Sequence, residues 1–125
     1  ESIYAGLALQ PRHVDTIEWF ATADEVCRAF AGLQQQAADP NLGPLDAILS
    51  QEDAGIDLDP SDWPTVWYKG GSEPGVLTLG WLATHAQGET FVVEAMVTDT
   101  DTALADEVIT DIVELSGRAF ELLGP

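Results

Sequence analysis

The chain has 125 residues, which fits one domain that buries roughly two-thirds of its unfolded surface, so we predict a single domain over residues 1–125. Hydrophobic residues make up 46% of the chain and favour a packed core over disorder. The net charge of −18, from 22 acidic against 4 basic side chains, argues against binding to nucleic acid or to anionic membranes. A solvated acidic surface explains this charge, and an acidic protein that captures a basic partner is the alternative.

Targeting and redox signals in the chain are few. No apolar run is long enough to span a bilayer, so membrane insertion is not expected. No signal peptide is visible, and a chain that starts at Glu1 is compatible with a processed or truncated piece. Cys27 is the single cysteine, so an internal disulfide is excluded. We expect its side chain to be a small buried hydrophobe. His13 and His85 are far apart in the chain, so we expect neither a catalytic triad nor a metal site, and no cofactor.

The first half of the chain predicts two helices. Thr22 and Glu25 form a capping-box pattern, and the apolar spacing that follows predicts a helix from about residue 23 to about residue 38, ended by Asp39-Pro40. Apolar residues at three- and four-residue steps predict a short second helix over about residues 44–52. Residues 53–64 read as a turn-rich loop.

The second half predicts three strands, over residues 65–70, 75–84 and 90–98, and then a long helix that ends near Gly124. Caps for this helix are expected within residues 99–102, and residues 85–89 read as a hairpin loop. Both faces of the strands are largely apolar, as expected when helices cover the two sides of a sheet. The fold class is therefore α+β, an antiparallel three-stranded meander with two N-terminal helices and a long C-terminal helix across one face.

Lys69, the only lysine, is the strongest candidate for chemistry. It ends an aromatic strand-like run and is followed by Gly70 and Gly71, which would let a ligand lie against the backbone. Its ammonium can hold a carboxylate or phosphate, and the Ser72 amide can donate into an oxyanion hole. Residues 72–75 are expected to turn the chain. The alternative is structural, with glycines that relieve a bulge and a lysine that pairs with a surface carboxylate.

Three tryptophans, Trp63, Trp67 and Trp81, are expected to pack in the core rather than to line a sugar site.

The segment Trp67 to Ser72, with the hairpin and long helix after it, resembles the last third of the serine β-lactamase and penicillin-binding-protein superfamily, closest to class A-like actinobacterial serine hydrolases. The segment Trp19 to Ala29 is similar to the helix after the omega-loop region in these proteins, and the resemblance covers about residues 17–123.

This resemblance implies a partial β-lactamase-like fold, an extracytoplasmic location and a small-molecule or peptidoglycan-like substrate. Lys69 would match the lysine of the Lys-Thr-Gly motif, and the Ser72 amide would help to form the oxyanion hole, so these two are the implied catalytic residues. Gly70, Gly71 and Glu73 are the implied substrate-binding residues. Glycine at position 70 departs from the motif, which carries a hydroxyl there, and fits a relative with another substrate or with none.

The family nucleophile, in Ser-x-x-Lys, is missing from the chain, and so is Ser-x-Asn. We therefore expect the C-terminal segment of a β-lactamase-like serine hydrolase that is inactive alone, with its nucleophile elsewhere. The alternatives are a non-catalytic binding or scaffold domain of similar fold and an acidic interaction protein. An unpaired sheet edge in such a segment predicts a companion chain or self-association.

Overall fold

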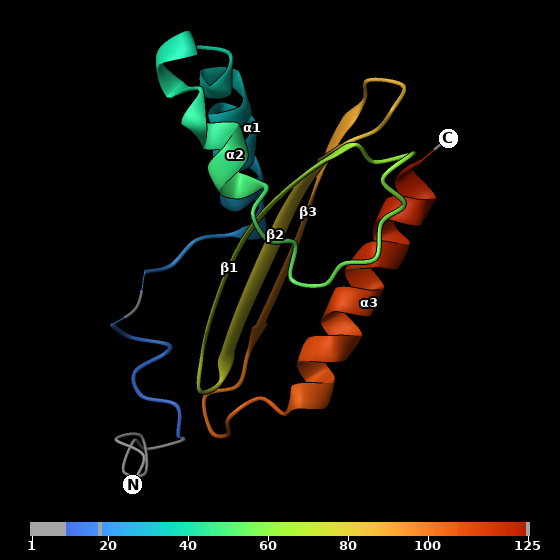
Figure 1. Ribbon diagram of the computed structural model, residues 1–125. Coiled ribbons are helices and arrows are strands. Elements are labelled where there is room, and N and C mark those ends of the chain that lie inside the picture. The colour runs from blue at the N-terminus through green and yellow to red at the C-terminus, as the bar shows by residue number, and fades with distance from the viewer. Residues whose placement is uncertain (1–9, 18, 125) are drawn as a thin grey trace, which may run out of the picture.

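The computed structural model describes residues 10–17 and 19–124 and has α+β architecture (Figure 1). The elements in chain order are α1 (Ala23–Ala37), the 3-10 helix η1 (Pro40–Leu42), α2 (Pro44–Leu49), β1 (Thr65–Glu73), β2 (Val76–Thr84), β3 (Thr90–Thr98) and α3 (Asp106–Leu123). The strands form one antiparallel sheet in the order β1-β2-β3. This arrangement confirms the predicted three-stranded meander between N-terminal helices and a long C-terminal helix.

The predicted capping box starts α1. The Thr22 amide donates to Glu25 Oε2 at 2.8 Å, and the Glu25 amide donates to Thr22 Oγ1 at 3.2 Å, so two of the free donors at the helix start are satisfied. The hydrogen bonds that the Glu25 carboxylate accepts from the Thr22 amide and then from the Thr22 hydroxyl hold the pKa of Glu25 below its usual value. The predicted second helix is too long at its C-terminal end, because α2 ends at Leu49. Ser50, with φ of −94° and ψ of 8°, is the C-cap of α2, and the left-handed Ala54 and Gly55, with φ of 58° and 76°, belong to the loop that follows.

Strand β1 is longer than predicted. It continues through Gly70, Gly71 and Ser72, which pair in unbroken register with Leu79, Thr78 and Leu77, so the reading of the two glycines as a bulge is wrong. The turn is confined to Pro74 and Gly75, where Gly75 has φ of 83°, a value that favours glycine. The prediction that residues 72–75 turn the chain is therefore corrected, and Ser72 belongs to a strand.

Side chains of the sheet alternate between two apolar layers. One face packs against α3 through a cluster that contains Leu77, Leu79, Trp81, Ala83 and Phe120. The other face packs against α1 and α2 through Phe30, Trp67 and Leu82. Helices on both sides of the sheet are visible in Figure 1, as the two apolar strand faces predicted. The three tryptophans are at most 6% exposed, which confirms their predicted place in the core.

The start of α3 differs from the prediction. Asp99 accepts hydrogen bonds from the Asp101 and Thr102 amides and from the Thr102 hydroxyl, so it organises a turn after β3 and caps no helix. The helix begins at Asp106, after Ala105, which gives no side-chain cap. Within residues 10–17 and 19–124, no helix is both long and apolar enough to cross a bilayer.

Candidate functional site

The backbone of β1 presents unpaired groups along one edge of the sheet. The Asp99 amide donates to the Gly75 carbonyl at 2.8 Å and the His85 amide to the Glu89 carbonyl at 2.7 Å, so odd-numbered residues of β2 bond to β3. Even-numbered residues of β2 then bond to β1, because the ladder alternates. Register therefore turns the N–H and C=O groups of Tyr68, Gly70 and Ser72 outward. No further strand covers this edge in the part of the chain that the structure describes.

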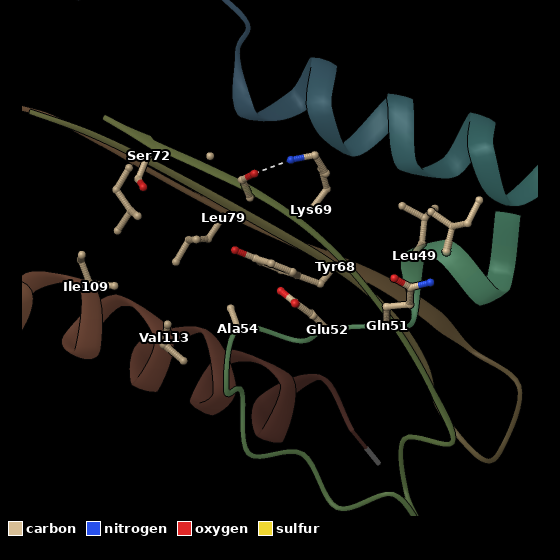
Figure 2. A pocket seen from close by; sticks show the side chains of 14 residues that line it. Leu49, Gln51, Glu52, Ala54, Tyr68, Lys69, Ser72, Leu79, Ile109 and Val113 are labelled. Atoms are coloured by element: carbon tan, nitrogen blue, oxygen red, sulfur yellow. Dashed lines mark hydrogen bonds between the residues drawn. The ribbon is translucent and has the colours of Figure 1, made fainter. Parts of the chain in front are cut away.

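A cleft of about 510 Å³ runs along this edge (Figure 2). Its rim is the β1 backbone from Lys69 to Ser72, and its apolar floor comes from β2 and α3. The segment after α2 closes the third side. The lining residues are Ile48, Leu49, Gln51, Glu52, Ala54, Tyr68, Lys69, Gly70, Gly71, Ser72, Leu77, Leu79, Ile109 and Val113.

Two indole groups hold the wall that follows α2. Trp67 Nε1 donates to Asp46 Oδ1 at 2.6 Å, which ties α2 to β1. Trp81 Nε1 donates to the Asp53 carbonyl at 2.7 Å, which ties the next segment to the middle strand. The Asp53 side chain in turn accepts from the Gly55 amide at 2.8 Å. Because both indoles are buried, these bonds fix the wall of the cleft against the core.

Lys69 lies at the rim of the cleft with an exposed side chain. Alternation places it on the face of Trp67, and Figure 2 shows it on the opposite side of β1 from Tyr68. Its ammonium folds back over the strand and donates to the outward carbonyl of Gly70. The sole lysine therefore brings its positive charge to the free edge of the sheet, where the outward N–H groups also lie.

The two glycines differ in what their missing side chains make possible. A Cβ at Gly70 would lie 2.0 Å from the Tyr68 hydroxyl and 2.7 Å from its ring, so Gly70 makes room for Tyr68. A Cβ at Gly71 would meet nothing within 4 Å. The expectation that both glycines admit a ligand is therefore corrected, because only Gly71 leaves open space beside the backbone.

The sequence interpretation missed two polar groups of the cleft. The Tyr68 hydroxyl lies over Gly70, and its pKa is raised by burial and, to a lesser degree, by the charge of Glu52. Figure 2 shows the Glu52 carboxylate beside the Tyr68 ring. Tyr68 belongs to the aromatic run before Lys69, and its ring packs against Trp81 at 5.6 Å between centroids. The sequence holds one sign of this arrangement. Gly70 lies two residues after Tyr68 on the same face of the strand, and its missing side chain leaves room for the ring.

The structure brings together four of the five implied site residues. Lys69, Gly70, Gly71 and Ser72 line the cleft, whereas Glu73, which shares the α1 face of β1 with Lys69 and Gly71, lines a separate groove near α1. His85 is away from the cleft and packs edge-on against Trp63, with ring centroids 5.0 Å apart. Its Nδ1 accepts from the Gln87 amide at 3.2 Å.

The chemistry of the cleft follows from its own groups. No family model and no curated protein matches the chain. One ammonium, outward backbone N–H groups and an apolar floor suit a ligand with a carboxylate or another anion at one end. Among the described residues, Lys69 donates to the Gly70 carbonyl and His85 accepts from the Gln87 amide, so neither is hydrogen-bonded to the Ser72 hydroxyl.

Proposed function

We propose that this chain forms the sheet-edge wall of a substrate cleft in a serine hydrolase that resembles the β-lactamase and penicillin-binding-protein superfamily. The observation that carries the proposal is that Lys69, Gly71 and Ser72 line one cleft at the free edge of β1. In this proposal the cleft takes a small molecule or a peptidoglycan-like substrate, and the protein acts outside the cytoplasm.

Each group has a role in this proposal. The Lys69 ammonium attracts the carboxylate of the substrate as a point charge. The outward N–H of Ser72 donates to an oxygen that gains negative charge, which is the role of an oxyanion-hole donor. Leu77, Leu79 and Val113 give an apolar floor for the body of the substrate.

The nucleophile comes from outside these 125 residues. The sequence holds no Ser-x-x-Lys, since its single lysine is Lys69, and the Ser72 contribution is its backbone amide. A longer protein that carries this chain, or a companion chain, would supply the attacking serine and its base at the open side of β1.

A second function, non-catalytic binding, is favoured by one observation. The Tyr68 ring occupies the space over Gly70, where the family motif carries a hydroxyl side chain. A cleft changed in this way, with Lys69 retained, would still hold an anionic ligand but would no longer place it for reaction.

Labelling by a fluorescent penicillin separates these functions when it is applied to the native parent protein that contains this chain. The hydrolase proposal expects covalent labelling, and Lys69→Ala lowers its rate at least about tenfold because a charged partner of the substrate is lost. Arg118→Ala, on the exposed face of α3, is the matched control that keeps the labelling rate. Unchanged labelling of Lys69→Ala would remove Lys69 from the mechanism, and absence of labelling with several lactam and ester probes would favour non-catalytic binding.

A further inference from the structure

Glu94 is a carboxylate buried without a partner. It lies in the middle of β3, and both of its side-chain oxygens are buried without a hydrogen-bond partner within the described residues. The residue as a whole is only half-buried. Buried charged groups in folded proteins nearly always have a partner, so this carboxylate calls for an explanation.

The missing side chain of Gly80 creates the space in which this carboxylate lies. Gly80 is the neighbour of Glu94 on β2, and a Cβ there would be 2.3 Å from Glu94 Oε2 and 2.7 Å from Phe30 Cε2. The carboxylate thus sits over bare backbone of the middle strand, below the ring that α1 brings to the sheet. Glycine inside a strand often marks such a close approach.

Lys69 is the next member of the same cross-strand row. It pairs with Gly80 on the other side, so Lys69, Gly80 and Glu94 follow one another across the three strands on the α1 face. The Cα atoms of Lys69 and Glu94 are then about 10 Å apart on ordinary strand spacing. The long stems of the two side chains are able to span this gap beside the Phe30 ring, which also lies over Gly80. Lys69 is also the only basic residue on the three strands.

We propose that Glu94 is a positioning residue for Lys69, whose ammonium pairs with the ionised Glu94 carboxylate across Gly80 and returns to the Gly70 carbonyl when that carboxyl is protonated. The structure shows the second of these states, with the ammonium on Gly70. In the first state the positive charge leaves the rim of the cleft. This consequence for ligand binding rests on the proposed function, whereas the pairing itself does not.

The other ionisable groups near Glu94 do not offer it a cation. Helix α1 brings Cys27, whose pKa is raised by burial and then by the charges of Glu94 and Asp24. Arg28 is held by Asp24 in an exposed ion pair at 2.7 Å. Strand β2 contributes bare Gly80. Burial raises the pKa of Glu94 to about 7, so the carboxyl changes charge near neutral pH, where an ammonium is fully protonated.

A carboxyl titration of the full chain by carbon NMR tests this pairing without any ligand. An ammonium that binds the ionised form lowers the pKa of a carboxyl by about 1 or more, so wild-type Glu94 should titrate below 7 and Lys69→Met should raise its midpoint by about one pH unit. Arg28→Met is the matched control and should leave the midpoint unchanged. The Lys69 Cε signal of the wild type should move with the same midpoint.

Equal midpoints for wild type and Lys69→Met would overturn the proposal, and so would a Lys69 signal that ignores the titration of Glu94. Neither result depends on whether the cleft binds a substrate. Failure of the penicillin labelling would, conversely, leave the carboxyl titration as expected.

Discussion

Glu94→Gln should make the protein less sensitive to pH. The pKa of Glu94 is raised from 4.5 to about 7 by burial, so the folded protein keeps this proton over a pH range in which the unfolded chain has released it. The free energy of unfolding therefore falls as the pH rises from about 4.5 to about 7 and levels off above that range. Glutamine has the same shape as the protonated carboxyl and carries no charge at any pH.

The size of the effect follows from the two pKa values. A displacement from 4.5 to about 7 corresponds to at most about 3 kcal/mol, at about 1.4 kcal/mol per pH unit. Glu94 is only half-buried as a residue, and pairing with Lys69 offsets part of the cost, so we expect about 1–2 kcal/mol. The free energy of unfolding of Glu94→Gln should be closest to that of the wild type at pH 5. At pH 8 it should exceed the wild-type value by about 1–2 kcal/mol.

Urea unfolding, followed by tryptophan fluorescence between pH 5 and pH 8, measures this difference directly. The stability difference between Glu94→Gln and the wild type is compared at pH 5 and pH 8. Any effect of the amide group that does not depend on pH cancels in this comparison. Glu89→Gln, in the exposed hairpin loop, is the matched control and should show no such gain at high pH. A stability difference between Glu94→Gln and wild type that stays constant across the pH range would refute the reasoning.

Three further results are expected. Gly70→Ala should cost about 1–3 kcal/mol in urea unfolding because its Cβ displaces the Tyr68 ring, whereas Gly71→Ala should be close to neutral; equal costs would contradict the close approach at Gly70. Trp67→Phe and Asp46→Ala should each destabilise the protein, with a coupling energy of about 0.5–1.5 kcal/mol in a double-mutant cycle. Strictly additive effects would mean that the hydrogen bond between these two side chains does not stabilise the fold. Light scattering should show self-association or a companion chain through an unpaired edge of the three-stranded sheet, and a monodisperse monomer would contradict this expectation.

The sheet could be predicted because its signals are local. Leu77, Leu79 and Trp81 alternate along one strand, and short links between strands leave antiparallel pairing as the simple solution. The end of β1 was missed because Gly70 and Gly71 weaken strand propensity, yet their backbones pair as well as any other residue. Tertiary pairing with β2 overrides the local preference there.

The candidate site was only partly visible in the sequence. Lys69 stood out by its rarity, but the wall that holds Glu52 comes from a different segment, and its position depends on the Trp81–Asp53 hydrogen bond. Glu94 is the one charged residue of an otherwise largely apolar strand, and this strand pattern alone does not mark it as a site. A charged residue at a position that should face a helix, opposite a mid-strand glycine such as Gly80, was the available signal.

In the proposed function, the free edge of β1 binds a carboxylate beside Lys69. Amide NMR of the full chain, titrated with N-acetyl-D-alanyl-D-alanine, tests it most directly, with the methyl ester of the same dipeptide as the control. The Gly71 and Ser72 signals should shift in a saturable way with the free acid, and Lys69→Met should weaken this binding at least about tenfold, as the loss of a charged partner costs. Binding at this edge would be contradicted if the Gly71 and Ser72 signals did not shift with the free acid or shifted equally with the ester. It would also be contradicted if Lys69→Met bound the acid as tightly as the wild type.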